Sequence, residues 1–278
     1  MRTRTLTASC ELPDILDETV LESIRRTAWV GRELVCLSEA DSTNTRAKQL
    51  AEEGYPEGTL VVAEYQSAGR GRRGREWEGP SGAGIYMTLV LKPEIEPDNA
   101  SMLTLIAALA VSAAARKLTG RSVGIKWPND IVMNGKKICG ILTEMSLQSD
   151  HIDHIVIGIG INVHNEHFPE EIAGVATSLY LETGEHYRRA VLIEEIWEQF
   201  EHYYGIFMET WDLGGLIKEY NAHLVNMNQE VKVLDPREPF EGRSMGITAR
   251  GELMVDTREG CRLVSSGEVS VRGVYGYV

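Results

Sequence analysis

The sequence predicts an α+β protein in which a large domain is followed by a small β-barrel. In the large domain, strand-like runs such as residues 84–92 and 154–163 are interspersed with helical patterns, the longest at 99–119. From about Gln229 the chain consists of short strand-like pieces separated by Gly, Pro and Asp turns. A chain of 278 residues is long enough to bury a core in both parts. The predicted division is a lead segment at 1–33, a main domain at 34–228 and the barrel at 229–278.

The lead segment is expected to form one short helix. Its apolar residues recur at helical spacing, and the helix is expected to close near Gly31. These apolar residues are Ile15, Leu16, Val20, Leu21 and Ile24. Residues 33–54 then indicate a strand, a loop rich in capping residues and a helix that ends at Gly54. Strand-like runs at 59–66 and 84–92 follow, so the arginine-rich stretch between them is a loop joining two strands.

The middle of the chain contains the strongest hairpin signal. Residues 122–127 lead through Pro128 into a short strand, and Asn134-Gly135 then predicts a tight turn back. Counting back from this turn pairs Lys137 with Val132 and Lys136 with Met133, so the two lysines point to opposite faces of the sheet. The inward lysine needs an anionic partner.

Three further helices and one glycine-containing strand complete the main domain. Residues 99–119 are apolar nearly all round, which predicts a buried helix. Gly158 and Gly160 alternate within a strand, so they share the face where something can approach the backbone closely. Two more helices are expected at about 188–209 and 213–224.

Composition points to a protein of the reducing cytoplasm. Hydrophobic residues make up 43% of the chain and charged residues 25%, which is ordinary for a globular protein. The formal net charge of -13 disfavours general binding to nucleic acid or anionic membranes, so any anion site must be local. No signal peptide is visible, and the most apolar run, Leu103 to Ala115, is short for a membrane span. The few, widely spaced cysteines suggest neither a disulfide framework nor a thiolate zinc site; they are Cys10, Cys36, Cys139 and Cys261.

The stretch GRGRRGR at residues 69–75 sets four arginines among three glycines. It spells the dinucleotide-binding pattern G-x-G-x-x-G, but the residues after it cannot form the helix that this reading requires. A solvated basic loop is one remaining interpretation. The other is an anion-binding loop, in which glycines let backbone N–H groups and guanidinium groups wrap a polyanion together. Because clustered arginines repel one another, such a loop is expected to be mobile when empty and ordered by a phosphate-bearing ligand.

A second motif, KWPND at residues 126–130, places a lysine and a carboxylate around a rigid turn. These groups suit an ATP phosphate and its Mg²⁺, although a polar turn with local capping is the plainer alternative. The histidine pairs at 151/154 and 164/167 are poorly spaced for a metal site on a strand, and no metal site is predicted. No nucleophile elbow is present, so a hydrolytic triad is not supported.

Taken together, the motifs resemble those of biotin protein ligases, in the order of that family. The resemblance runs from about residue 34 to the C-terminus and rests above all on the motifs GRGRRGREW and KWPND. The motifs are DSTN (41–44), GRGRRGREW (69–77), KWPNDI (126–131), KKICGIL (136–142), GIGINV (158–163), TSL (177–179) and GEVSVRG (267–273).

This resemblance implies a mixed-sheet catalytic domain of the class II synthetase-like biotin/lipoate ligase type with an SH3-like C-terminal barrel. It also implies a two-step ligase. Biotin and MgATP would give biotinyl-5'-adenylate and pyrophosphate, and biotin would then pass to one lysine of a biotin carboxyl carrier protein, such as that of acetyl-CoA carboxylase. The arginine loop would fold over biotin and the adenylate and exclude water.

Site residues are carried over from the family motifs position by position. The positions implied for biotin are Ser42, Thr43, Asn44, Gln66, Gly69, Arg70, Gly71, Arg72, Lys137, Gly158 and Gly160. Those implied for ATP or the adenylate are Arg72, Arg75, Trp77, Asn129, Asn162 and Arg272. Those linked to the chemistry are Lys137, Arg72, Lys126 and Asp130. Asp130 is the candidate to orient or deprotonate the acceptor lysine, and a magnesium-ligand role is an equal alternative.

Several points stay open at the level of sequence. Only about 33 residues precede the catalytic segment, too few for the winged helix-turn-helix of bifunctional members, so a ligase that binds no operator DNA is expected. A lipoate or octanoate ligase and a biotin-sensing module without catalysis are the alternatives. An exposed sheet edge could serve either a homodimer or the carrier protein.

Overall fold

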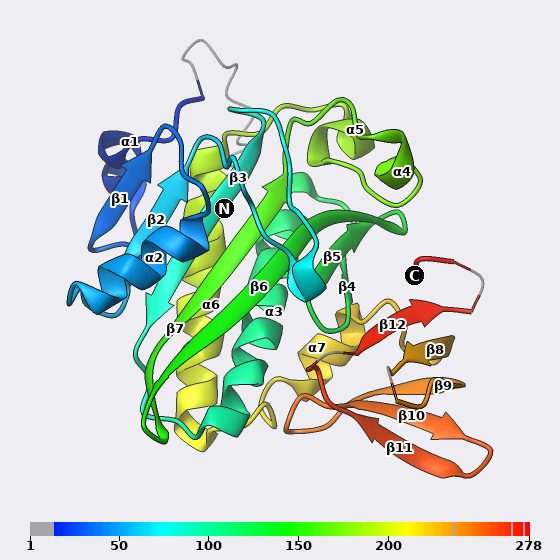
Figure 1. Cartoon of the computed structure of the whole chain (residues 1–278). Helices are drawn as coiled ribbons and strands as arrows, with labels where there is room; N and C mark the ends of the chain where they lie inside the picture. Colours follow the sequence, from blue (N-terminus) through cyan, green and yellow to red (C-terminus); the bar gives the residue numbers. More distant parts are fainter. Residues whose placement is uncertain (1–13, 236, 268, 275) are drawn as a thin grey trace, which may run out of the picture.

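The computed structural model describes residues 14–278 except 236, 268 and 275 (Figure 1). Its centre is a seven-stranded sheet in which β1 is parallel to β2 and the other neighbours are antiparallel, so the predicted mixed sheet is confirmed. In spatial order the strands are β1 (Leu34–Leu37), β2 (Leu60–Ala63), β3 (Gly84–Leu91), β7 (His151–Asn162), β6 (Lys136–Gln148), β5 (Asp130–Met133) and β4 (Gly124–Lys126).

Two long helices cover one face of this sheet and a shorter helix covers part of the other (Figure 1). The long helices are α3 (Ala100–Thr119) and α6 (Arg189–Thr210), and the shorter one is α2 (Thr43–Glu52). The part of the second face that α2 leaves uncovered is crossed by the chain between β2 and β3, which carries the arginine motif. The arginine stretch thus joins two paired strands, as predicted.

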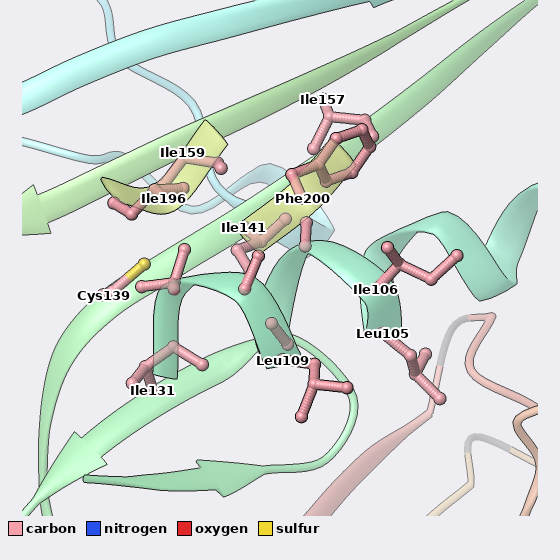
Figure 2. Close-up of a cluster of buried hydrophobic side chains, with 14 of the residues drawn as sticks. Leu105, Ile106, Leu109, Ile131, Cys139, Ile141, Ile157, Ile159, Ile196 and Phe200 are labelled. Atoms are coloured by element: carbon pink, nitrogen blue, oxygen red, sulfur yellow. The ribbon is translucent and has the colours of Figure 1, made fainter. Parts of the chain in front are cut away.

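Alternation along β7 separates the core from the site. Ile157 and Ile159 point toward α3 and α6, where they pack with Leu109, Phe200 and other apolar side chains (Figure 2). The residues between them point to the opposite face, because successive side chains of a strand alternate. Gly158 is one of these, so the same strand supplies a packed core on one side and bare backbone on the other.

Helix α3 is buried because its surface is apolar nearly all round, as the sequence predicts. With the 3₁₀ turn η2 (Pro97–Asn99) before it, it is long and apolar enough to cross a membrane by length and composition. In the structure it packs against the sheet and beside α6, in the position of a core helix.

The lead helix differs from the prediction at its start. Helix α1 (Glu18–Ile24) begins after Asp17, whose side chain accepts a hydrogen bond from the N–H of Val20 at 2.7 Å. Ile15 and Leu16 therefore precede the helix, and Ile15 is 53% exposed. Helical spacing of apolar residues alone could not locate the start, because the N-cap decides it.

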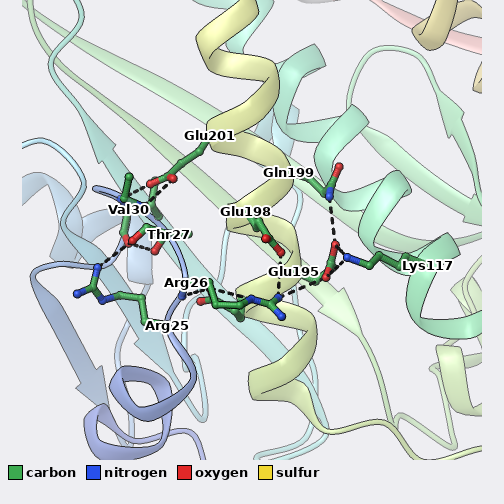
Figure 3. Close-up of polar contacts among 11 residues, drawn as sticks. Arg25, Arg26, Thr27, Val30, Lys117, Glu195, Glu198, Gln199 and Glu201 are labelled. Atoms are coloured by element: carbon green, nitrogen blue, oxygen red, sulfur yellow. Dashed lines mark hydrogen bonds and ion pairs between the residues drawn. The ribbon is translucent and has the colours of Figure 1, made fainter. Parts of the chain in front are cut away.

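Ion pairs and hydrogen bonds of charged side chains hold the segment that follows α1 against helix α6 (Figure 3). The Arg26 guanidinium contacts Glu195 and Glu198, and Lys117 of α3 donates to the same Glu195. The Glu201 carboxylate accepts the backbone N–H groups of residues 28–30. This turn leads to Gly31, where the lead helix was predicted to close; the helix ends earlier, at Ile24, so that prediction was wrong.

The connection from β7 to α6 and beyond contains short helices that the sequence analysis did not anticipate. They are α4 (Glu170–Ala173) and α5 (Leu179–Thr183). Helix α7 (Ile217–His223) is shorter than the predicted 213–224. Asp212 accepts the N–H of Gly214 at 2.8 Å, and this side-chain hydrogen bond favours a turn over a helix.

A second, five-stranded antiparallel sheet follows, with the SH3-like arrangement expected for the barrel. Its order is β11 (Gly260–Val264), β10 (Leu253–Thr257), β9 (Phe240–Ile247), β8 (Glu230–Leu234) and β12 (Ser270–Gly273). Its apolar residues belong to the same buried cluster as the main core. The Trp127 indole N–H donates to the Gly251 carbonyl at 3.0 Å and joins the two sheets. We keep residues 33/34 and 228/229 as proposed domain boundaries.

Candidate active site

A pocket of about 430 Å³, partly open to solvent, lies on the sheet face opposite α3 and α6. It brings together most of the residues that the sequence analysis assigned to biotin and to the nucleotide. The lining residues are Ser42, Thr43, Asn44, Gln66, Arg70, Gly71, Arg72, Trp77, Asn129, Lys137, Gly140, Ile141, Leu142, Gly158, Ile159 and Gly160.

One end of the pocket is built by the N-terminus of α2. Ser42 takes the N-cap position, but its side chain makes no capping hydrogen bond. The Gln66 side-chain oxygen accepts the Thr43 N–H at 2.8 Å and the Thr43 hydroxyl at 3.0 Å. Buried Thr88 on β3 places its hydroxyl 2.8 Å from both the Thr43 hydroxyl and the Asn44 side-chain oxygen. The result is a set of fixed amide and hydroxyl groups that can bind a small polar ring.

Asn44 is held in place from the other side. Its amide nitrogen donates to Glu144 at 2.7 Å and to the Leu142 carbonyl at 3.2 Å. Lys48 donates to the second oxygen of Glu144 at 2.5 Å. Burial alone would raise the pKa of Glu144, but the hydrogen bonds from Lys48 and Asn44 hold it below its usual value. Asn44 is therefore fixed with its side-chain oxygen toward the sheet.

The floor of the pocket is bare backbone because larger residues would not fit. A Cβ on Gly158 would stand 2.0 Å from the Asn44 side-chain oxygen. A Cβ on Gly160 would stand 2.5 Å from the Trp77 ring, and one on Gly140 would stand 2.9 Å from it. The Trp77 indole N–H is buried and has no hydrogen-bond partner in the described part of the chain. The indole thus covers the glycine floor.

The arginine loop closes the pocket from above with a compact turn. The Gly71 N–H donates to the Arg75 carbonyl at 2.7 Å, and the Trp77 N–H donates to the Gly69 carbonyl at 2.9 Å. Arg72 donates to the Asn129 side chain at 2.9 Å and also to the Ser266 and Gly267 carbonyls of the small sheet. Through Arg72, the loop therefore contacts both the KWPND turn and the C-terminal sheet.

The cationic end of the site centres on Asp130, which is only 9% exposed. One carboxylate oxygen lies 2.6 Å from Lys137 Nζ, and the other lies 3.9 Å from Lys126 Nζ and accepts the Tyr277 hydroxyl at 2.6 Å. The predicted pairing of Lys137 with Val132 is confirmed, and Lys137 is the inward lysine while Lys136 is exposed. Its anionic partner in the structure is Asp130.

Burial and these contacts shift the pKa values of Lys126 and Asp130. Burial lowers the pKa of Lys126 to about 8, although Asp130 partly opposes the shift. Burial favours the neutral form of Asp130, but Lys137 and Lys126 overcome it and hold the pKa of Asp130 below its usual value. The cluster is thus one buried carboxyl group held between two lysines.

The remaining predicted residues lie near the pocket without lining it. Arg75 and Arg272 are close enough to contribute to the lowered pKa of Lys126. Asn162, at the end of β7, donates to the Thr177 carbonyl at 3.0 Å and is buried. Gly69 lies against Trp77 and Gln66, where a Cβ would stand 2.3 Å from the Trp77 carbonyl oxygen. The Asn162 side chain thus contacts the TSL motif.

Sequence reasoning missed Thr88, Glu144 and Tyr277. Thr88 is a polar residue in the middle of an apolar strand run, and that was the available signal. Glu144 sits in a strand whose register was known only near the Asn-Gly turn. Within the described residues, no group of three His, Cys, Asp or Glu side chains is placed to hold a metal ion.

The chain matches two family models. Residues 37–162 match the biotin/lipoate A/B protein ligase family, and residues 227–272 match the biotin protein ligase C-terminal domain. The bifunctional ligase/repressor BirA of Bacillus spizizenii is 37% identical over 261 residues, which cover 93% of this chain and 80% of that protein. The biotin--[acetyl-CoA-carboxylase] ligase of Paracoccus denitrificans is 43% identical over 129 residues, 46% of this chain and 53% of that one.

A solved structure gives the same picture. The biotin protein ligase from Aquifex aeolicus in complex with biotin and ATP is 32% identical, with a TM-score of 0.75. The similarity covers 87% of this chain and 99% of that chain.

Proposed function

Because the chain belongs to the biotin protein ligase family, we propose that it joins biotin to AMP and then transfers biotin to a carrier-protein lysine. The observation that supports this two-step reaction is the division of one pocket into two ends. Fixed amide and hydroxyl groups lie at one end, and Arg72, Lys137 and the Asp130 cluster lie at the other. A ligand with a polar ring and a carboxylate would span them.

Biotin would bind with its ureido ring at the N-terminus of α2. Ser42, Thr43 and Gln66 would provide its hydrogen-bond partners, and Asn44 would take part while Thr88 and Glu144 hold it. The ring system would lie over Gly158 and Gly160, which leave room only because they lack a Cβ. The backbone of Gly69, Arg70 and Gly71 would hold the carboxylate end.

In the first step, a biotin carboxylate oxygen would attack the α-phosphorus of ATP, and the bond from that phosphorus to pyrophosphate would break. Negative charge gathers on the phosphoryl oxygens, where Arg72 and Lys137 would stabilise it. Lys137 would exchange Asp130 for the acyl phosphate. The adenylate would contact Trp77 and Asn129, with Arg75, Asn162 and Arg272 around it.

In the second step, the acceptor lysine nitrogen would attack the acyl carbon, and the C–O bond to AMP would break. The lysine must lose a proton, and Asp130 is our candidate to orient or accept it. Lys126, beside Asp130, would keep the region cationic toward AMP.

Mg²⁺ would accompany ATP as its counterion. This ion usually keeps several water ligands and binds through substrate phosphates and one or two carboxylates, so the ATP phosphates and water would supply most of its ligands here.

The partner would be a biotin carboxyl carrier domain. A formal net charge of -13 disfavours operator DNA, so we propose ligase activity without repression. The proposal includes a homodimer in which sheet edges of two copies pair, because β1 and β4 are the outer strands of the large sheet.

The test is transfer of label from radiolabelled biotin, with ATP and magnesium, to a purified biotin carboxyl carrier domain. We expect labelled adenylate without the carrier and a labelled carrier lysine with it. Lys137→Ala should form no adenylate and serves as the negative control. Labelling from lipoate but not from biotin would replace this function with lipoate ligation, and biotin binding without pyrophosphate release would indicate a sensor.

A further inference from the structure

Tyr277 reaches the site from the extreme C-terminus. It lies beyond residue 272, where the match to the C-terminal family model ends. Its hydroxyl donates to Asp130 at 2.6 Å across 147 positions of sequence. Its ring also lies under Lys126, whose Nζ is 4.2 Å from the ring centroid. One side chain of the tail thus contacts two members of the cationic cluster.

The contact with Asp130 completes the fixation of that carboxylate. Lys137 holds one oxygen at 2.6 Å and the Tyr277 hydroxyl holds the other. A carboxylate held at one oxygen can still turn about its side-chain bonds, whereas one held at both oxygens has a fixed plane. Because Asp130 is buried, the ion pair with Lys137 and the hydrogen bond from Tyr277 act in a low dielectric, which strengthens both.

The contact with Lys126 acts in the same direction. A buried ammonium over an aromatic face is attracted by the negative face of the ring. The ring therefore favours the charged form of Lys126, which burial and the neighbouring Lys137 both disfavour. Its burial and the Asp130 carboxylate raise the pKa of Tyr277, so the hydroxyl keeps its proton and remains a donor.

We propose that Tyr277 is a positioning residue for the ligase reaction: its hydroxyl fixes Asp130 and, through Asp130, the Nζ of Lys137 at the edge of the pocket. This inference rests on the proposed function, because Lys137 is assigned there to the acyl phosphate. Its contacts are with Asp130 and Lys126, and neither of these lines the pocket, so we expect its effect on the rate of the chemistry and not on biotin affinity.

The experiment compares Tyr277→Phe with the wild-type chain in biotin-dependent pyrophosphate release. Phe keeps the ring under Lys126 and removes only the hydroxyl. We expect kcat to fall roughly tenfold, the size of effect typical for one hydrogen bond to a charged group, with KM for biotin within about twofold. Tyr277→Ala removes the ring as well and should fall further.

Tyr203→Phe is the matched control. The Tyr203 hydroxyl donates to Glu219 at 2.5 Å, between α6 and α7, so this variant also loses a tyrosine–carboxylate hydrogen bond but outside the site. Its kcat should equal that of the wild type. Thermal unfolding of all three variants reports any loss of folded protein.

Three results would overturn the inference. An unchanged kcat for Tyr277→Phe would show that the hydroxyl does nothing in the reaction. A raised kcat would make the tail an obstruction. An equal loss in Tyr203→Phe would make the effect one of stability. Wild-type chain that releases no pyrophosphate would instead refute the proposed function, so the two failures are distinguishable.

Discussion

The Trp77 indole lies directly on Gly160. A Cβ at residue 160 would stand 2.5 Å from the six-membered ring edge and 2.6 Å from the indole nitrogen. The glycine floor that is assigned to biotin is thus covered by Trp77, a residue that is assigned to the adenylate. A ligand that rests on this floor has to displace the indole, whose buried N–H has no hydrogen-bond partner among the residues that the structure describes.

We therefore expect Trp77 to change its environment when ligands bind. Addition of biotin and ATP should alter the tryptophan emission, with a decrease if the indole stacks on adenine. The measurement is steady-state fluorescence of the wild type and of Trp77→Phe. The four other tryptophans remain in that variant, so the same change in Trp77→Phe would contradict displacement of Trp77.

Gly158→Ala should weaken biotin binding. Its Cβ would stand 2.0 Å from the Asn44 side-chain oxygen, and Asn44 cannot yield easily because Glu144 and Leu142 hold its nitrogen. We expect the dissociation constant for biotin to rise by roughly 10- to 100-fold, as for a typical overpacking cost of 1–3 kcal/mol. Calorimetric titration with biotin measures it.

Gly174→Ala is the control for that experiment. A Cβ there meets nothing within 4 Å, and its φ of -73° suits alanine. Equal biotin affinity in Gly158→Ala and the wild type would remove the glycine floor from the binding site.

The sequence was sufficient for most of the sheet because its signals are local. The Asn134-Gly135 turn sets the register of β5 and β6 next to it, and it correctly turned Lys137 inward. Farther from that turn the register shifts between Ile131 and Val132, which no local rule predicts. The start of the lead helix was predicted too early. Its apolar spacing continues on the N-terminal side of Asp17, the residue that caps the helix.

The sequence analysis missed the site residues whose contacts join distant parts of the chain. The motif residues were found because they cluster along the chain, whereas Tyr277 meets Asp130 across 147 positions. Thr88 is similar, because only the folded sheet places it beside Thr43 and Asn44. Such residues can be found only in the folded structure, because tertiary packing and not their spacing in the sequence brings them together.

Arg72→Gly should let the adenylate escape. Arg72 ties the loop to Asn129 and to the carbonyls of Ser266 and Gly267, so its loss removes the contacts that hold the loop closed. We expect free biotinyl-adenylate to appear in solution at least about tenfold faster, since hydrogen bonds to a charged group contribute roughly 1.5–3 kcal/mol each. Chromatography of the nucleotide products measures the release.

Arg73→Gly is the matched control within the same loop. Arg73 is exposed and has a left-handed φ of 60°, which glycine adopts readily. Retention of the adenylate by Arg72→Gly as firmly as by the wild type would refute the closing role of the loop.

Arg189→Met should destabilise the fold. The Arg189 guanidinium is 1% exposed and pairs with Asp14 at 2.9 Å and Glu64 at 2.7 Å. Its removal leaves two carboxylates without their cation, and breaking a buried pair in this way typically costs about 3–5 kcal/mol. Denaturant unfolding measures the loss. Lys232→Met, which breaks an exposed pair with Glu241, should change stability by less than about 0.5 kcal/mol, and an equal loss in both would contradict the role of burial.

The free energy of unfolding should change with pH because Lys126 has different pKa values in the folded and unfolded states. Burial lowers its pKa from 10.5 to about 8, so the folded protein loses this proton near pH 8 while the unfolded chain keeps it to about pH 10.5. Between these values the unfolded state binds more protons, and the free energy of unfolding therefore rises with pH because of Lys126. Below pH 8 both states are protonated, and the full cost of burying the charge, roughly 3 kcal/mol, is present.

Lys126→Met removes this titration and isolates it. The variant should unfold with a higher free energy than the wild type at pH 7, and the difference should shrink as the pH rises from 8 to 10.5. Denaturant unfolding of both proteins across this range gives the difference, in which the other titrating groups cancel. A difference that is constant with pH would mean that Lys126 keeps its ordinary pKa in the fold. The ring of Tyr277 and the Asp130 carboxylate would then compensate its burial completely.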